Sequence, residues 1–169
     1  NNKKIGVVGV GYVGLPLAIE FGKKYKTVAY DINVKRIVKL KNSIDVSGEI
    51  SKNDFKKSRR IYFTSNQLDL EDCEIYIVTV PTPINNRNFP NFYYLKQASK
   101  IVGKFLRKKN VVIYESTVYP GATEEICVPI LEKFSKLKCI KKNNFINDGF
   151  YCGYSPERIN PGDKRRKIS

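Results

Sequence analysis

The sequence contains no histidine in its 169 residues. Zinc sites are built largely from histidine and cysteine, and serine or cysteine nucleophiles commonly need an imidazole as their base. The four cysteines show neither a CxxC pair nor the spacing of metal ligands; they are Cys73, Cys127, Cys139 and Cys152. We therefore expect no metal site, no histidine-dependent nucleophile, and four reduced, mostly buried thiols.

Long apolar runs are also missing. No stretch approaches the roughly 20 apolar residues that a membrane-spanning helix needs, and the first residues, Asn1 to Ile5, lack the apolar core of a signal peptide. With 41% hydrophobic and 28% charged residues, the chain is too apolar to be disordered. We expect a soluble globular protein with a cytoplasmic location and no membrane partner.

The charge balance is strongly basic, at +15. Clustered lysines and arginines would indicate a nucleic-acid partner, because they displace counterions from the phosphate backbone. Here the cations are spread along the chain in short groups, such as Lys23-Lys24 and Lys108-Lys109. We expect most of them on solvated helix faces and loops. Nucleic-acid binding is therefore the less favoured alternative, whereas a field of this sign favours a small anionic ligand.

Short apolar runs alternate with segments of helical periodicity. The strand-like runs are 5–8, 27–30, 61–63, 75–78, 111–114 and 150–154. Helical spacing marks residues 12–24, 34–40, 92–107 and 122–134, with Pro129 as an irregularity in the last, while 42–60 has no clear pattern. The alternation predicts an α/β fold, a mostly parallel sheet covered by helices, in one domain over residues 1–169.

The segment from Gly9 to Gly14 has the spacing GxGxxG. That pattern alone is weak, but here it follows a predicted strand, opens a predicted helix, and is followed by Asp31 at the end of the next strand. Gly9 permits a sharp turn, Gly11 lets the backbone approach a pyrophosphate, and Gly14 lets the helix pack closely on the strand. The pattern predicts a Rossmann-type, doubly wound sheet with helices on both faces.

The helix after this turn offers unpaired N–H groups and a partial positive charge to phosphates. We therefore expect Tyr12 and Val13 at the cofactor together with the three glycines. Asp31 is expected to accept hydrogen bonds from the adenosine ribose, which favours NAD because a carboxylate repels the extra phosphate of NADP. Arg36 is also expected at the cofactor, and because a guanidinium there can hold that phosphate, NADP stays an alternative.

Three further segments, together with Gly9–Leu15, resemble the UDP-glucose/GDP-mannose dehydrogenase family. They are VPTP at 80–83, ESTVYPG at 115–121 and YSPERINPGD at 154–163. The motifs cover essentially the whole chain, and four in this order are more specific than one. Each of the three follows a predicted parallel strand, and ligands of open α/β sheets bind at the carboxyl ends of the strands. We expect the segments to converge on one site.

The resemblance implies that Pro81 and Thr82 lie along the cofactor. It implies that Ser116 and Thr117 lie near the nicotinamide and that Thr117 positions a catalytic water. The alternative for Thr117, from the residues alone, is a hydroxyl that caps the helix beginning near Pro120.

Glu157 corresponds to a glutamate that assists hydrolysis of a covalent intermediate in the family, and we expect it to contact the substrate together with Arg158. A carboxylate there can act as general base if its environment tunes its pKa. The alternative is a surface ion pair between Glu157 and Arg158.

The resemblance further implies oxidation of the C6 alcohol of a UDP-sugar to a carboxylate, for surface polysaccharide synthesis, by a dimeric enzyme. The segment 155–163 is more similar to the UDP-N-acetylhexosamine enzymes than to the UDP-glucose enzymes. Pro161 stands where the latter carry a second glutamate, so that glutamate's role is not carried over. Arg166 stands where the former have a histidine.

The family's cysteine nucleophile, lysine and asparagine lie beyond residue 169, and Cys152 is the cysteine nearest the expected site. We therefore expect an NAD-binding piece without the connecting helix and the UDP-binding domain, unable by itself to complete the oxidation. A non-catalytic NAD-binding module or a degenerate paralogue is the alternative from another class.

Overall fold

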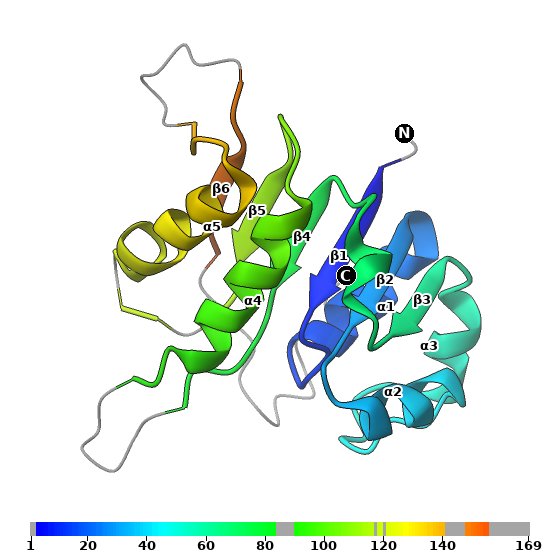
Figure 1. The fold of residues 1–169 in the computed structure, drawn as a ribbon. Helices are drawn as coiled ribbons and strands as arrows, with labels where there is room; N and C mark the ends of the chain where they lie inside the picture. Colours follow the sequence, from blue (N-terminus) through cyan, green and yellow to red (C-terminus); the bar gives the residue numbers. More distant parts are fainter. Residues whose placement is uncertain (1–2, 84–89, 117, 120, 141–147, 156–169) are drawn as a thin grey trace.

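The computed structural model describes residues 3–83, 90–116, 118–119, 121–140 and 148–155. Within these residues a six-stranded sheet has the order β3-β2-β1-β4-β5-β6, and every neighbouring pair is parallel (Figure 1). The strands are β1 (Lys4–Val8), β2 (Lys26–Tyr30), β3 (Ile61–Thr64), β4 (Ile75–Val78), β5 (Val111–Tyr114) and β6 (Tyr151–Tyr154). This order is that of the doubly wound dinucleotide-binding fold, so the predicted fold class is confirmed.

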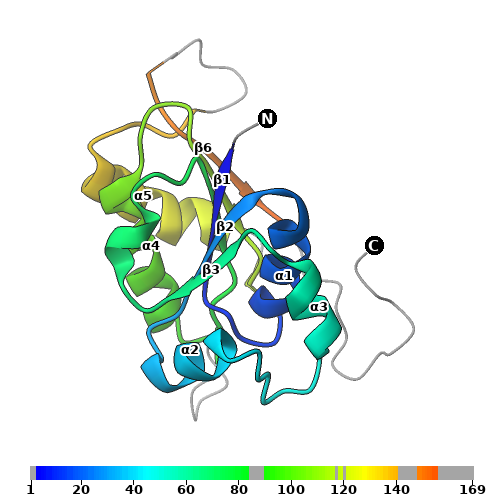
Figure 2. The same ribbon diagram turned by 90° about the vertical axis from the view of Figure 1, so that its right-hand side faces the viewer.

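Helices cover the two faces of the sheet. One face carries α1 (Gly14–Lys24), α2 (Val34–Lys41) and α3 (Lys52–Lys57). The other carries the 3₁₀ turn η1 (Gln67–Leu70), α4 (Tyr93–Phe105), the π-helical turn η2 (Thr123–Cys127) and α5 (Val128–Ser135). In Figure 2, α4 and α5 lie to one side of the strands and α1 and α3 to the other.

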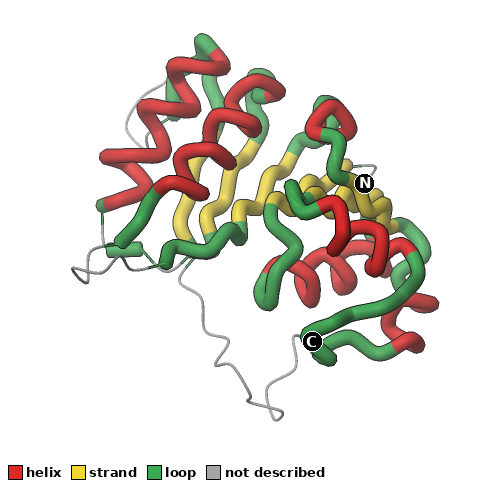
Figure 3. The backbone as a smooth tube through the Cα atoms, turned by 60° about the horizontal axis from the view of Figure 1, so that its bottom comes forward, coloured by secondary structure: helices red, strands yellow, loops and turns green. Residues whose placement is uncertain are grey.

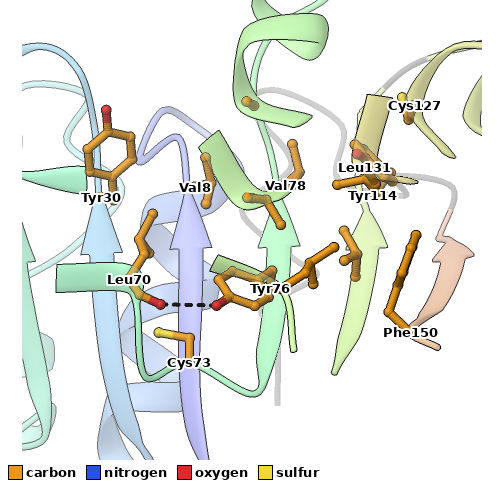
Figure 4. Close-up of a cluster of buried hydrophobic side chains, with 14 of the residues drawn as sticks. Val8, Tyr30, Leu70, Cys73, Tyr76, Val78, Tyr114, Cys127, Leu131 and Phe150 are labelled. Carbon is orange, nitrogen blue, oxygen red and sulfur yellow. Dashed lines mark hydrogen bonds between the residues drawn. The ribbon is translucent and has the colours of Figure 1, made fainter. Parts of the chain in front are cut away.

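Alternate strand residues supply the two cores, because successive side chains of a strand point to opposite faces. On the α4 face, the buried Tyr76 and Tyr114 also carry a hydroxyl into the core (Figure 4). Tyr76 donates to the carbonyl of Leu70 at 3.1 Å, and the Tyr114 hydroxyl lies 2.7 Å from Ser99 Oγ. Burial raises the pKa of both tyrosines. Their hydroxyls therefore stay protonated and join the sheet to its covering elements.

Two short helices, α3 and η1, lie in parts of the sequence for which no element was predicted. The first turn of α3 is stabilised by a capping box between Ser51 and Asp54, and η1 begins after Asn66, whose side chain accepts from Leu68 N–H. The helix expected over 122–134 is divided into η2 and α5. Pro129 is the second residue of α5 and lies in its first turn.

Candidate functional site

Most of the expected site residues that the structure describes lie at the carboxyl edge of the sheet, near the point where β1 and β4 leave it in opposite directions. In a doubly wound sheet this switch point at the carboxyl ends of the strands is where ligands bind. Figure 3 turns that edge of the sheet toward the viewer. The chain leaves β1 through Gly9, whose N–H donates to the Tyr30 carbonyl of β2 at 2.8 Å. The turn therefore begins as an extension of the sheet.

The three glycines have three different environments. Gly9 has φ +94°, in the left-handed region that favours glycine. At Gly14, an added Cβ would lie 1.9 Å from the Gly9 carbonyl oxygen, so only glycine lets α1 approach the turn this closely. A Cβ on Gly11 would meet nothing within 4 Å. The open side of the turn at Gly11 is thus where another molecule can approach the backbone.

The amino end of α1 has no side-chain cap, and in its first turn the Leu15 N–H donates to the Gly11 carbonyl at 3.0 Å. Val13 stands at the N-cap position without a side-chain hydrogen bond, and the first turn holds no acidic residue. Uncapped N–H groups at a helix start attract anions through direct hydrogen bonds and the helix dipole. Tyr12, Val13 and the glycines are therefore contiguous around a position suited to a phosphate.

Thr79, directly after β4, is a site residue that the sequence reasoning missed. Its hydroxyl lies 2.5 Å from the Gly9 carbonyl oxygen, and its N–H donates to the Val8 carbonyl at 3.0 Å. Thr79 is 6% exposed, and the bond is partly buried. The one available signal was a hydroxyl residue immediately after the apolar strand, between β4 and the VPTP segment.

Asp31 and Arg36 both reach the peptide of Val10 within the turn. One Asp31 carboxylate oxygen accepts from Val10 N–H at 3.0 Å and the other accepts from Asn33 N–H at 2.8 Å. The Arg36 guanidinium donates to the Val10 carbonyl at 3.2 Å. The N–H and the carbonyl of Val10 are thus both bonded to side chains that follow β2. The carboxylate is anchored, and each of its oxygens retains a lone pair for a further donor.

The ends of β4 and β5 are also joined. Ser116, 3% exposed, donates its hydroxyl to the Val80 carbonyl at 2.8 Å. Pro81 is exposed and Thr82 is half-buried just beyond this bond. The bonds at Tyr30, Thr79 and Ser116 link the carboxyl ends of β1, β2, β4 and β5, so the described motif segments do converge.

Glu115 is a second residue that the sequence reasoning did not single out. It follows β5, its N–H donates to the Val78 carbonyl at 2.8 Å, and its side chain bonds that of Ser155 beyond β6. Burial raises the pKa of this half-buried carboxyl, and the hydrogen bond from Ser155 partly offsets the rise. The pair joins β5 to β6 at the carboxyl edge.

Three expected residues, Thr117, Glu157 and Arg158, lie outside the described residues. The described thiols are all wholly or partly buried. All four cysteines are free, as expected; Cys73 and Cys127 are buried and Cys139 and Cys152 are half-buried. Burial raises the pKa of Cys73 to about 12 and that of Cys127 to about 11, and it raises the pKa of Cys152 as well. The reactive form of cysteine is the thiolate, which burial disfavours here.

Two surface hollows lie away from the glycine turn. One, of about 400 Å³, is at the amino ends of the strands, between Lys4, Lys26 and Arg60 on one side and Asp69 and Glu71 on the other. The second, of about 480 Å³, lies at the start of α4 and is lined by residues 90–93 and 96. Neither contains a residue of the turn.

Within the described part of the chain, no helix is both long and apolar enough to cross a membrane. In the same part, no three His, Cys, Asp or Glu side chains are grouped so that they could hold a metal ion.

Residues 3–168 match the model of the UDP-glucose/GDP-mannose dehydrogenase family, NAD binding domain. The chain is 53% identical over 166 residues to the UDP-N-acetyl-D-glucosamine 6-dehydrogenase of Pseudomonas aeruginosa, with 98% of this chain and 38% of that protein covered. It is 49% identical over 166 residues to the enzyme of the same name from Salmonella typhi, with 98% and 37% covered. The chain thus spans less than two-fifths of the length of these relatives.

One solved structure is similar to this chain over most of its length. The UDP-D-ManNAc dehydrogenase of Pyrococcus horikoshii has a TM-score of 0.81 and 30% identity to this chain, over 94% of this chain and 37% of the other.

Proposed function

This chain belongs to the UDP-glucose/GDP-mannose dehydrogenase family as its NAD binding domain, and from that premise we propose that it binds NAD for the oxidation of a UDP-sugar C6 alcohol to the uronic acid. A UDP-N-acetylhexosamine is the proposed sugar, because two relatives, 53% and 49% identical over 166 aligned residues, carry UDP-N-acetyl-D-glucosamine in their names. We assign the product to surface polysaccharide synthesis and the enzyme to the cytoplasm as a dimer.

The residues present fit a dinucleotide. The observation that carries the proposal is the turn around Gly11, where a Cβ would meet nothing within 4 Å while the uncapped start of α1 lies beside it. The pyrophosphate would be held by the N–H groups of this turn, with Tyr12 and Val13 alongside. Asp31 would accept from the adenosine ribose, with its carboxylate already fixed by two backbone N–H groups.

The chemistry divides between this chain and the rest of the enzyme. When bound, NAD supplies the acceptor for the hydride that leaves C6. Ser116 and Thr79 hold the loops after β5 and β4 in register with the turn, so that Pro81 and Thr82 line the path of the cofactor. Thr117 would position a water, and Glu157, with Arg158, would contact the substrate. The thiol for the covalent step is proposed to come from outside this chain, because burial raises the pKa of Cys73, Cys127 and Cys152.

Calorimetric titration tests the cofactor half of the proposal. The chain should bind NAD, and Gly11→Ala should weaken binding by about tenfold or more, equivalent to about 1.4 kcal/mol, with Gly11→Val weaker still. Thermal unfolding should be unchanged in both variants, because the added atoms point into open space. A folded chain that does not bind NAD contradicts the proposal.

The substrate half needs the complete enzyme. NADH formation with UDP-N-acetylglucosamine, UDP-N-acetylgalactosamine and UDP-glucose should be fastest with one of the acetylated sugars, with two NADH formed per sugar oxidised. The isolated chain should bind NAD without turnover. Turnover by the isolated chain, or a preference of the complete enzyme for UDP-glucose, counts against the assignment.

A further inference from the structure

Exposed aliphatic side chains gather in one short segment around α2. Five of the large exposed hydrophobic residues come from residues 32–46, and they are Ile32, Val34, Val38, Ile44 and Val46, between 51% and 78% exposed. Single exposed apolar residues are ordinary, but a concentration of them marks a surface that another molecule covers. In Figure 1, α2 lies at the margin of the fold, beside the loop that carries Ile44 and Val46.

The outer side of α2 carries two parallel rows. Val34 and Val38 are four residues apart and exposed, and Lys35 and Lys39, also four apart, lie beside them on the same side. The opposite side packs Ile37 and Leu40 into the core. The exposed apolar residues of the outer side are therefore not part of the hydrophobic core.

The other charges of this segment are engaged elsewhere. Arg36 donates to the Val10 carbonyl, and Lys41 lies over the ring of Tyr62 at 5.8 Å. The Asp45 carboxylate turns inward and accepts from the N–H groups of its own loop at Ser47, Glu49 and Ile50.

No ion pair of Lys35 or Lys39 is found among the described residues. These lysines are thus the charges that accompany the exposed aliphatic rows. The surface they form is cationic and aliphatic.

We propose that the outer side of α2 and the following loop, from Ile32 to Val46, dock on an anionic lipid bilayer. The lysines complement acidic headgroups, and the aliphatic side chains enter the boundary between headgroups and acyl chains. The whole chain, at +15, is drawn toward the same surface. The expectation of no membrane partner came from the lack of a spanning segment, which does not bear on a helix that lies on the surface.

The cations of the patch favour a bilayer over a protein partner. Protein interfaces are enriched in aromatic residues and arginine and depleted in lysine. In this patch the apolar residues are isoleucine and valine alone, and the outward cations are lysines. Both surface hollows lie away from the patch, on other elements. A protruding aliphatic surface with lysines suits a deformable lipid surface better than a rigid groove.

Sedimentation with lipid vesicles tests the proposal. The chain should bind phosphatidylcholine vesicles that contain phosphatidylglycerol and bind pure phosphatidylcholine vesicles much less. Lys35→Glu with Lys39→Glu should weaken binding about tenfold or more, since each basic residue near an anionic surface contributes several-fold. Val38→Ser with Ile44→Ser should also weaken it several-fold.

Matched controls separate docking from general charge attraction. Lys100→Glu with Lys104→Glu makes the same charge change at the same spacing on α4, and Leu68→Ser removes an aliphatic side chain that is 61% exposed elsewhere. Both control variants should bind vesicles with an affinity closer to that of the parent chain than the α2 variants do. Calorimetry should give unchanged NAD affinity for the Val38/Ile44 variant, so failure here is separate from failure of the cofactor proposal.

Three outcomes overturn the inference. The first is no binding to acidic vesicles. The second is equal weakening by the α2 and α4 lysine pairs with no effect of the aliphatic pair, which means charge attraction alone. The third is a change in oligomeric state of the Val38/Ile44 variant without lipid, measured by light scattering, which assigns the surface to a second copy of the chain.

Discussion

The hydroxyl of Thr79 lies 2.5 Å from the carbonyl oxygen of Gly9, and this bond ties the end of β4 to the glycine turn that follows β1. The same two residues also bound the space of Gly14, whose Cβ would lie 2.4 Å from Thr79 Oγ1. The turn, the start of α1 and the end of β4 thus meet at one point, and the position of the backbone proposed to bind phosphate depends on it.

Thr79→Val should therefore loosen the turn without changing the size of the side chain much. The Gly9 carbonyl loses its partner in a buried place, which costs about 1–3 kcal/mol of folding free energy, and NAD affinity should fall several-fold because the turn is less well ordered. Thr79→Ser keeps the hydroxyl and should retain most of both. Urea unfolding and calorimetric titration measure the two effects; equal behaviour of the valine and serine variants would exclude a role for the bond.

The sequence predicted the fold well because its signals are local. Each strand is a short apolar run that the sheet buries, and the spacing of Gly9, Gly11 and Gly14 is set by backbone geometry. The short helices α3 and η1 were missed because they are fixed by side-chain capping at Ser51 and Asn66 rather than by an apolar period.

The hydrogen bonds that connect the loops of the site were harder to predict from the sequence. Thr79 and Ser116 act by bonding to carbonyls that are remote in the sequence, at Gly9 and Val80, and nothing near either residue identifies its partner. Asp31 was singled out by its position after β2, and its role at the cofactor stays a prediction. Its bond to Val10 N–H, across 21 residues, emerges only when β1 and β2 are placed side by side.

Gly14→Ala should be severely destabilising, in contrast to Gly11→Ala. The new methyl would lie 1.9 Å from the Gly9 carbonyl, a backbone atom that cannot move without shifting the turn, so a loss of about 3 kcal/mol or more is expected. Gly153→Ala, where nothing lies within 4 Å, is the control on β6. Denaturant unfolding compares the variants, and a Gly14→Ala protein as stable as the Gly153→Ala protein would show that the turn can relax.

Asp31→Asn should reduce NAD affinity about tenfold, which corresponds to about 1.4 kcal/mol. The amide can offer only one oxygen to Val10 N–H and Asn33 N–H, so one of these donors faces an NH₂ group. Loss of the negative charge also removes the repulsion of a ribose phosphate. The ratio of NADP to NAD affinity should therefore rise. Titration with both nucleotides measures this, with Asp72→Asn, an exposed change at the amino ends of the strands, as control.

Glu115 should make the folded chain less stable as pH rises. Its pKa in the folded state is raised above the ordinary value of 4.5, mainly by burial, so the folded state binds more protons than the unfolded state above about that pH. Stability then falls between 4.5 and the raised pKa, and levels off beyond it. In Glu115→Gln the side chain has no carboxyl group that titrates in this range. The unfolding free energy of the parent minus that of the variant should therefore decrease with pH across this window.

Two further variants test the direction of this pH dependence. Ser155→Ala removes the hydrogen bond that lowers the pKa of Glu115, so the falling window should extend to higher pH. Asp54→Asn provides the opposite case, because the Ser51 hydroxyl holds the pKa of Asp54 below 3.8, and the parent should gain stability over the variant as pH rises toward that value. Parallel slopes for the Glu115 and Asp54 variants in urea unfolding would rule out the assigned burial of Glu115, since only a carboxyl stabilised in its neutral form gives a falling difference.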